Sequence, residues 1–367
     1  MFDRRLIQYF DWGLLFVTAL IGLIGLVTLY SAATAGGQAV LKTMYLKQLV
    51  WYGIGFFVMI FCFIFNYKHL DQWANVIYLS CNGLLVMVLL FGKFVAGSRR
   101  WLVLGPISVQ PSELIKIAMI IALARYYSKA AGSAGVTLRE LVVPCLLTAV
   151  PFLLIVKQPD LGTALMLVLI GGSITLFVKI ERRSLACLSG AGIVLIPSVW
   201  FLLKGYQKQR ILTFLNPDRD PLGAGYHIIQ SKIAIGSGMI FGKGFLKGTQ
   251  NVLSFLPEQH TDFIFSVLAE EWGLAGAVTL LFVFFLLLAR GTSIAYKCRD
   301  PFGTILSVGI TAMMFWQVLI NIGMVMGLMP VVGIPLPFIS YGGSSIITMM
   351  IGTGLLMNIS MRRFMIE

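Results

Sequence analysis

Long apolar runs, separated by short polar segments, occupy most of the chain. Ten of these runs approach the ~20 residues that a helix needs to cross a bilayer. Because every backbone polar group must be hydrogen-bonded inside lipid, each run is expected to be helical. The predicted spans lie near residues 13–32, 50–65, 76–92, 113–126, 141–156, 163–178, 184–203, 263–289, 302–328 and 344–361. The pattern predicts an all-α, polytopic membrane protein of ten helices, forming a single transmembrane domain over residues 1–367.

One stretch departs from this pattern. Residues 204–262 contain no convincing span, and loops of this length usually serve a function. Within the stretch, Tyr226, Ile229 and Ile233 share one helical face, which predicts a short amphipathic helix on the bilayer surface. We therefore expect 204–262 to form one long loop within the domain, carrying short amphipathic helices.

Composition excludes several classes of protein. The chain is 58% hydrophobic and 12% charged, whereas a typical soluble domain is about 25% charged. This balance argues against a soluble enzyme, a disordered chain and a secreted disulfide scaffold. The five cysteines are scattered and form no metal or disulfide pattern. The net charge of +13 does not indicate nucleic-acid binding, because the basic residues lie between apolar runs and form no basic face.

The distribution of basic residues predicts the orientation in the membrane. Cytoplasmic loops carry an excess of Lys and Arg, and with ten helices both termini lie on one side. The loops on the side of the termini hold fourteen basic residues, and the short loops opposite hold six. We therefore expect both termini in the cytoplasm and the long loop outside. The fourteen are Arg4, Arg5, Lys68, Arg125, Lys129, Arg139, Lys179, Arg182, Arg183, Arg290, Lys297, Arg299, Arg362 and Arg363; the six are Lys42, Lys47, Lys93, Arg99, Arg100 and Lys157.

Four ionisable residues stand out inside predicted spans, where charge is costly and function is the first hypothesis. Glu113 and Lys116 are three residues apart on one helix, and an ion pair near the helix end explains them equally well. Glu270 and Glu271 lie one to two turns into the eighth span. Structural hydrogen bonds to a neighbouring helix are a slightly better explanation for these two than direct chemistry.

Basic residues also gather in the loops opposite the termini. Arg99 and Arg100 precede Trp101, and Lys208 and Arg210 begin the long loop. Such a cluster could hold a phosphate or pyrophosphate through charge-assisted hydrogen bonds; contact with anionic lipid is the alternative.

Two aspartates stand immediately before predicted spans. Asp160 is placed to cap the N-terminus of the sixth predicted helix, and Asp262 that of the eighth. Taken alone, helix capping is the simpler explanation of each aspartate. A carboxylate at the membrane edge also feels the helix dipole, which favours ionisation, and desolvation, which opposes it. These opposing effects suit Asp262 to act as a general base. Glu258 could orient it, whereas His260 is more simply a polar contact.

Six segments in one order give the chain a recognisable signature. They are 100–101 (Arg-Trp), 110–113 (Gln-Pro-Ser-Glu), 158–163 (Gln-Pro-Asp-Leu-Gly-Thr), 221–238, 255–271 and 330–343. Over nearly its whole length the sequence resembles the SEDS family (shape, elongation, division and sporulation), most closely its rod-shape branch.

The resemblance implies a peptidoglycan glycosyltransferase that polymerises lipid II into β-1,4-linked strands at the outer face of the bacterial plasma membrane during elongation. The family's essential aspartate matches Asp262. The resemblance further implies a class B penicillin-binding protein as transpeptidase partner, together with other membrane proteins of the elongation complex. Substrate-binding residues implied by the same match are Glu258, Arg100, Lys116, Asp160, Arg210 and Lys232.

Two other functions stay open at this stage. A lipid II flippase would also have ten helices and charged residues within spans, and a scaffold could serve mainly to activate the transpeptidase. The long outer loop with Asp262 favours the enzyme, because a flippase needs no reactive base at its outer edge. No protein metal site is expected, so Mg²⁺ or another divalent cation would be held by the substrate's pyrophosphate.

Overall fold

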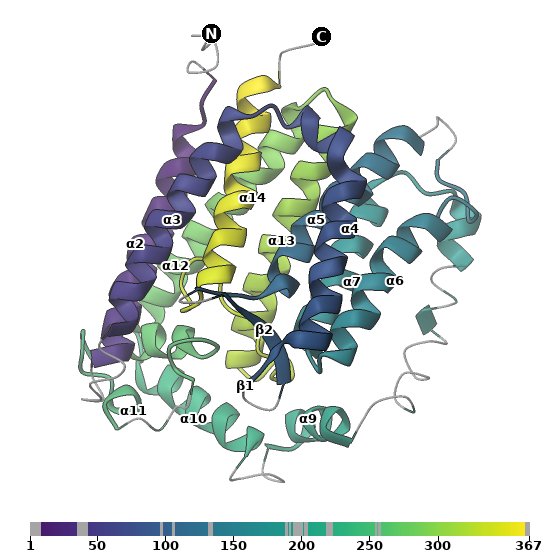
Figure 1. The fold of residues 1–367 in the computed structure, drawn as a ribbon. Helices are drawn as coiled ribbons and strands as arrows, with labels where there is room; N and C mark the ends of the chain where they lie inside the picture. Colours follow the sequence, from purple (N-terminus) through teal and green to yellow (C-terminus); the bar gives the residue numbers. More distant parts are fainter. Residues whose placement is uncertain are drawn as a thin grey trace.

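The computed structural model describes residues 9–34, 43–95, 98–104, 107–130, 135–187, 190, 192–193, 201, 205–217, 223–253, 255 and 258–363. Within these residues the protein is a bundle of long helices with shorter elements at one end (Figure 1). The long helices are α2 (Trp12–Thr34), α3 (Met44–Ile64), α4 (Lys68–Phe91), α5 (Pro111–Ala130), α6 (Val142–Lys157), α7 (Leu161–Phe177), α12 (Ile264–Lys297), α13 (Pro301–Val325) and α14 (Gly343–Arg362).

These nine helices of the described chain coincide with nine of the ten predicted spans, and the all-α membrane fold is confirmed. Six of the nine are long and apolar enough to cross a membrane: α2, α3, α4, α12, α13 and α14. Helices α6 and α7 are shorter apolar helices, and α5 is largely buried against α4, α7 and α13. The predicted span at 184–203 lies mostly outside the described residues.

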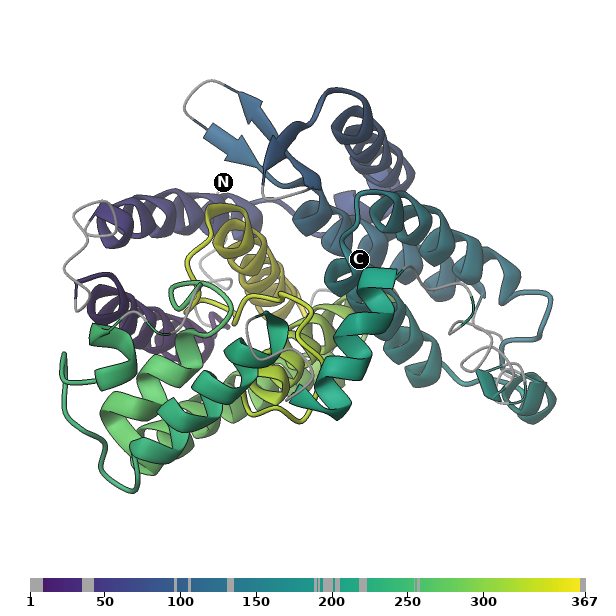
Figure 2. The same ribbon diagram turned by 90° about the horizontal axis from the view of Figure 1, so that it is seen from below.

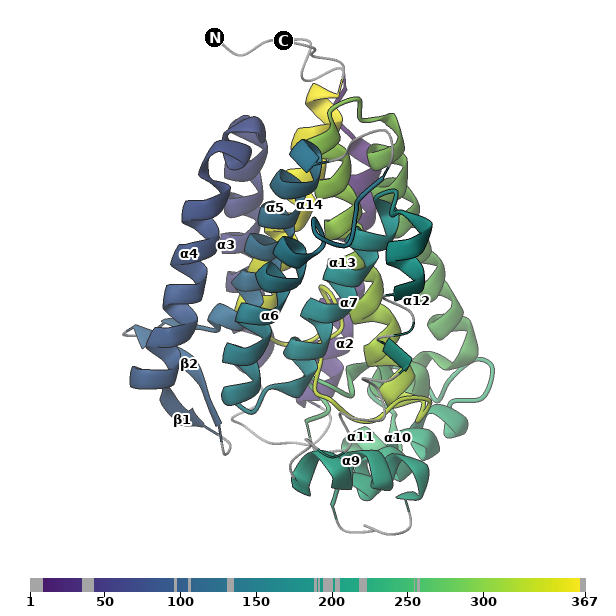
Figure 3. The ribbon, with the colours of Figure 1, turned by 90° about the vertical axis from the view of Figure 1, so that its right-hand side faces the viewer.

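The two ends of the bundle differ in character. The chain begins and ends at one end, whereas α9 (Gly205–Leu215), α10 (Ala224–Ser237) and α11 (Thr249–Val252) lie at the other (Figure 1). The end view in Figure 2 and the side view in Figure 3 show α9 and α10 crossing the ends of the long helices. The long predicted loop therefore covers the end opposite the termini.

Helix α10 contains the predicted amphipathic segment, but its protein-facing side is a different one. Ile228, Ser231 and Ala234 are buried, and Ser231 Oγ lies 2.8 Å from Ser266 Oγ of α12. The predicted apolar stripe stays less buried, and Ile233 is exposed. This stripe is free to face lipid, as an interfacial helix requires.

A small antiparallel sheet joins α4 to α5, and the sequence pattern did not predict it. Its strands are β1 (Lys93–Val95), β2 (Ser98–Leu104) and β3 (Ile107–Val109), in the order β1-β2-β3. The register pairs Lys93 with Trp101 and Leu102 with Val109. The sheet projects beside the helices (Figure 2) and fixes the position of Arg100 on β2.

Helix α12 is broken at Gly273, which has φ +66°. A Cβ at this position would lie 2.4 Å from the backbone nitrogen of Gly242, so the break requires glycine. The break leaves backbone N–H and C=O groups of α12 without partners inside the helix. Residues 239–244 of the long loop form hydrogen bonds with these groups, because backbone polar groups within a membrane must be paired. The bonds are Lys243 N to Glu270 O (3.0 Å), Gly244 N to Glu271 O (3.0 Å), Leu274 N to Met239 O (2.8 Å) and Ala275 N to Ile240 O (3.0 Å).

The segment between α13 and α14 is irregular yet buried. Phe338 and Ile339 are almost fully inaccessible to solvent. The side chain of Gln48 on α3 forms hydrogen bonds with the backbone of the residues that follow: it donates to Ser340 O (3.0 Å) and accepts from Gly342 N (3.2 Å). Non-helical backbone is tolerated among membrane helices when it is enclosed by protein in this way. The segment thus forms a fixed wall beside the start of α12.

Candidate active site

Asp262 lies just before α12, at the bundle end opposite the termini. The helix begins at Ile264, and Phe263 occupies the N-cap position without a side-chain cap hydrogen bond. The expectation that Asp262 caps this helix is therefore wrong. Its side chain is half-buried and lies beside Gly333, where a Cβ would be 3.2 Å from Asp262 Oδ2. The carboxylate is thus available for chemistry because it does not serve the helix.

A backbone clamp holds the turn that carries Asp262. Three consecutive carbonyl groups each accept a hydrogen bond from a different group of α13 or the irregular segment. His260 O accepts from Tyr341 N (2.9 Å), Thr261 O from Ser340 Oγ (2.6 Å), and Asp262 O from Asn321 Nδ2 (3.0 Å). The clamp fixes the main chain on both sides of the carboxylate, which is the preorganisation that a positioned base needs.

Four charged residues act on the carboxylate of Asp262. Together with burial they raise its pKa to about 6: burial is the largest influence and raises the pKa, Glu258 and Asp160 also raise it, and Arg210 and Arg100 lower it. Desolvation disfavours the charged form of an acid, whereas the two guanidinium groups favour it. A carboxylate with a pKa near 6 is ionised at neutral pH and still basic enough to accept a proton.

Arg100 and Asp160 are held in the site by contacts at the N-terminus of α7. Asp160 caps this helix as expected, with Oδ1 3.3 Å from Thr163 N and Oδ2 2.9 Å from Thr163 Oγ1. Arg100 donates to the carbonyl of Pro159, and its Nη1 lies 3.8 Å from Asp160 Oδ1. The cap and the β2 strand together hold one guanidinium group at this end of the bundle.

Arg210 of α9 supplies the second guanidinium group. Its Nη1 donates to the carbonyl of Val331 at 3.3 Å. The start of α7 packs on the same stretch, since a Cβ at Gly162 would lie 2.5 Å from Val332 O. Residues 331–333 are therefore the common support of Arg210, the α7 cap and Asp262.

Glu258 and His260 complete the turn. Glu258 is exposed, and its Oε2 accepts from Thr261 Oγ1 at 3.2 Å and lies 3.7 Å from His260 Nε2. Burial lowers the pKa of His260, and the charge of Glu258 opposes this. His260 is thus favoured as a neutral polar contact, whereas Glu258 acts on Asp262 through its charge.

Two of the residues predicted to bind substrate, Lys116 and Lys232, lie outside the group of charged residues around Asp262. Lys116 forms a buried ion pair with Glu113 (2.8 Å between Nζ and Oε1), so the ion-pair interpretation is confirmed. Lys232 lies along Gly327, where a Cβ would be 2.2 Å from Lys232 Cε. Neither is one of the four charges that shift the pKa of Asp262 most. The structure gathers Asp262, Glu258, Arg100, Asp160 and Arg210, but leaves Lys116 and Lys232 outside this group.

Glu270 and Glu271 hold the break in α12, which confirms their structural interpretation. Glu270 Oε1 accepts from the Lys243 ammonium group at 2.7 Å and from Gln250 N at 3.0 Å. Glu271 Oε1 accepts from the hydroxyl of Ser31 on α2. Both carboxylates are buried, and their hydrogen bonds tie the long loop to α12 and α2.

The comparison with protein families decides the identity of the fold. Residues 11–364 match the cell cycle proteins grouped as FtsW, RodA and SpoVE. The chain belongs to this family. The resemblance inferred from the sequence is thereby confirmed. The chain's apolar helices and the solved structures of this family indicate that it is a multi-pass membrane protein.

Curated relatives of this FtsW, RodA and SpoVE member share much of its length. The peptidoglycan glycosyltransferase MrdB of Escherichia coli (strain K12) is 46% identical over 302 residues, covering 81% of this chain and 80% of that protein. The peptidoglycan glycosyltransferase RodA of Treponema pallidum (strain Nichols) is 33% identical, covering 98% and 99%. The stage V sporulation protein E of Bacillus subtilis (strain 168) is 40% identical, covering 95% and 96%.

Two solved structures show the same fold as this family member. A chain from a study of how a peptidoglycan synthase complex coordinates polymerization and crosslinking has a TM-score of 0.82 and 34% identity, covering 97% of this chain and 98% of that one. The rod shape determining protein RodA of Thermus thermophilus has a TM-score of 0.72 and 31% identity, covering 97% and 98%.

Sequence reasoning missed three residues that build the site. Asn321 is fully buried in α13, Ser340 bonds Thr261, and Gly333 adopts φ +73° beside Asp262. Asn321 carried a usable signal, because an amide in an apolar run must find hydrogen-bond partners. Gly333 carried a weaker one, since a glycine between prolines often marks a special backbone conformation.

Proposed function

We infer that this chain is a peptidoglycan glycosyltransferase that polymerises lipid II during cell elongation. The names and identities of its relatives support the activity. The structural observation that carries the proposal is the half-buried Asp262, with a pKa of about 6, on which the guanidinium charges of Arg100 and Arg210 act. This arrangement joins a proton acceptor to a site for an anionic leaving group.

In the proposed reaction, Asp262 removes the proton from the 4-hydroxyl of the acceptor sugar. The resulting oxygen nucleophile attacks C1 of the donor, the bond from C1 to the polyprenyl pyrophosphate breaks, and the anomeric carbon inverts to a β-1,4 link. A general base contributes ~10²–10⁴-fold. Stabilisation of the departing pyrophosphate must supply much of the remaining acceleration.

Arg100 and Arg210 are the proposed pyrophosphate ligands, because guanidinium groups pair with phosphate oxygens through strong charge-assisted hydrogen bonds. Lys116 is no longer proposed for this task, since its ammonium group is paired with Glu113 and buried. Lys232 remains a candidate for more distant substrate contacts. The described residues gather no group of three or more His, Cys, Asp or Glu side chains fit to hold a metal ion. We therefore propose that a divalent cation, where one takes part, is bound through the substrate's phosphates.

The proposed orientation places both termini in the cytoplasm and the Asp262 site on the outer face. Support comes from two independent features. The basic residues of short loops concentrate on the side of the termini, and Asp262 and the helices of the long loop lie at the opposite end of the bundle (Figure 1). In the proposed orientation the Asp262 site faces the outside of the cell, where we propose that lipid II is polymerised.

A crosslinking partner follows from the chemistry of the product. The structural relative belongs to a study of a synthase complex that coordinates polymerization and crosslinking. We propose that a class B penicillin-binding protein supplies the transpeptidase for this chain. Other membrane proteins of the elongation complex would assemble around the pair.

The activity is tested with the purified full-length chain and its transpeptidase partner, incubated with lipid II in detergent. The enzyme is expected to form glycan polymer, because detergent leaves no compartments between which a lipid could be moved. Absence of polymer, together with lipid II flipping when the same protein is placed in vesicles, would instead identify a transporter.

A further inference from the structure

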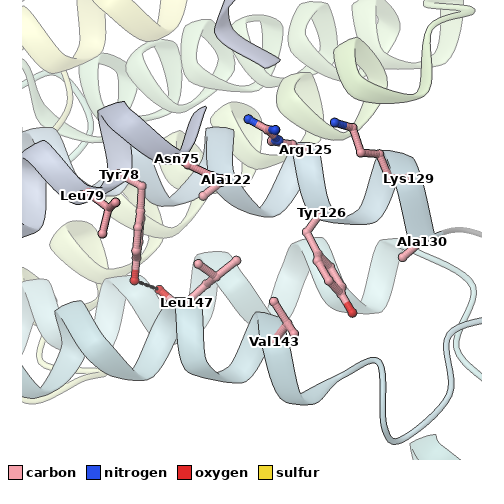
Figure 4. A pocket seen from close by; sticks show the side chains of 10 residues that line it. All are labelled: Asn75, Tyr78, Leu79, Ala122, Arg125, Tyr126, Lys129, Ala130, Val143 and Leu147. Carbon is pink, nitrogen blue, oxygen red and sulfur yellow. Dashed lines mark hydrogen bonds between the residues drawn. The ribbon is translucent and has the colours of Figure 1, made fainter. Parts of the chain in front are cut away.

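A groove of about 640 Å³ lies between α4, α5 and α6 (Figure 4). It lies toward the end of the bundle that carries the chain termini, where α4 and α6 begin and α5 ends (Figure 1). Its lining combines an apolar part with two basic side chains. The residues that matter for its chemistry are Tyr78, Leu79, Arg125, Tyr126, Lys129 and Val143. The groove is far from Asp262 and has no part in the proposed reaction.

The walls of the groove present apolar surface. Leu79 of α4 is 67% exposed and Val143 of α6 is 41% exposed. The two tyrosine hydroxyls are already used: Tyr78 donates to Leu147 O at 2.9 Å and Tyr126 to Glu140 O at 2.6 Å. The rings therefore offer their apolar faces, while their polar tips are satisfied by α6 and the turn before it.

One end of the groove is cationic. Arg125 and Lys129 lie one turn apart on α5 and point to the same side of it (Figure 4). Both hydrogen bonds that Arg125 donates within the described chain use Nη1, to Asp71 O (2.8 Å) and Gln72 O (3.0 Å). The carboxylate of Asp71 is 3.9 Å from Arg125 Nε and 3.9 Å from Lys129 Nζ, which is too long for a hydrogen bond.

The charges of this end do not balance. Among the described residues, Arg125 and Lys129 both form their ion pair with one carboxylate, that of Asp71, and the side chain of Lys129 is 59% exposed. The N-terminus of α4, which begins at Lys68, lies at the same end and adds the positive pole of its dipole. A further anion would be attracted here, and the remaining donors of Arg125 and Lys129 are available to bind it.

The depth of the groove matches the region where a lipid changes from headgroup to acyl chain. Along α4 the lining runs from Asn75 to Leu79, seven to eleven residues after Lys68, or about 10–16 Å into the helix at 1.5 Å per residue. A ligand must therefore combine a negative charge at the membrane surface with an apolar tail below it. Free phosphate lacks the tail, and a neutral lipid lacks the charge.

We propose that this groove binds an anionic phospholipid. Its phosphate pairs with Arg125 and Lys129, and one acyl chain lies along Leu79 and Val143. Basic pockets between membrane helices are established sites for anionic headgroups. A lipid seated here contacts α4, α5 and α6 together and stabilises their packing.

The test uses the full-length chain, freed of lipid in an uncharged detergent and titrated separately with phosphatidylglycerol and phosphatidylcholine. Native mass spectrometry counts bound lipids, and thermal unfolding reports stabilisation. We expect phosphatidylglycerol to bind more tightly and to raise the unfolding midpoint. Equal binding of the two lipids would overturn the proposal.

Three variants locate the site. Lys129→Gln changes an exposed side chain and should weaken phosphatidylglycerol binding about fivefold, because each basic residue contributes about 1 kcal/mol. The double variant Arg125→Gln with Lys129→Gln should weaken this binding roughly 30-fold, because it removes two such contributions. Val143→Trp keeps both charges but fills the groove, and should also weaken binding. The matched control Lys297→Gln with Arg299→Gln removes two exposed charges outside the groove and should have no effect. Unchanged preference in the groove variants, or full displacement of the lipid by equimolar inorganic phosphate, would refute the proposal.

Discussion

Replacing Asp262 by Asn should stabilise the folded protein while removing its activity. The carboxylate is desolvated in the folded state, and this raises its pKa from 3.8 to about 6. The folded chain therefore holds a proton more tightly than the unfolded chain does. Between these two pKa values the folded state binds more protons, so stability falls as pH rises through that window.

The size of the effect follows from the shift. A difference of about two pKa units, at 1.36 kcal/mol per unit, corresponds to ~3 kcal/mol of stability lost above pH 6. Because Asp262 is only half-buried, solvent screening reduces this figure, and we expect roughly 1–3 kcal/mol. Asn has the shape of Asp without the charge, so Asp262→Asn should recover this stability at pH 7.5 and gain little at pH 4.

Thermal unfolding in detergent at the two pH values measures the effect. Glu181→Gln is the matched control, because it makes the same chemical change at the end of the bundle that carries the termini. Asp160→Ala gives the opposite sign, since it removes the α7 cap and should cost about 1 kcal/mol. An Asp262→Asn protein that unfolds at the wild-type temperature at both pH values would show that Asp262 is not desolvated.

The remaining predictions concern the groups that support Asp262. Gly333→Ala should lower the unfolding temperature, because Ala is strained at φ +73°, and also the polymerisation rate, because its Cβ would lie 3.2 Å from Asp262 Oδ2; parallel rate and melting measurements check this. Asn321→Leu leaves the carbonyls of Asp262 and Ile334 without their hydrogen bonds and should cost about 2–4 kcal/mol in unfolding experiments. Arg210→Gln removes a charge that lowers the pKa of Asp262, so the pH–rate profile should move to higher pH; a profile that stays in place or moves lower would contradict the assignment.

The apolar pattern predicted the helices well because lipid burial leaves a chain few alternatives. Each long helix of the described residues coincides with an apolar run of the sequence. The pattern could not reveal the break at Gly273, because the run continues through it and only the inserted loop makes the break stable. The sheet at 93–109 was missed because its strands β1 and β3 are only three residues long, which is too short for an alternating pattern to be recognised.

The charges of the site were easier to find than their arrangement. Asp262, Arg100 and Arg210 stood out as polar groups at the ends of apolar runs. Their spacing gave no means of separating them from Lys116, whose partner Glu113 lies on the same helix. The cap at Asp262 was expected from local sequence, but the clamp from Tyr341, Ser340 and Asn321 fixes this turn instead, and such long-range contacts leave no local pattern.

The most direct test of the account is the rate at which Asp262→Asn polymerises lipid II in detergent, with the transpeptidase partner present. The account predicts that the folded variant forms no glycan polymer, while Glu181→Gln works at the wild-type rate. Polymer formed by Asp262→Asn as fast as by the unaltered protein would contradict the assignment of Asp262 as the base.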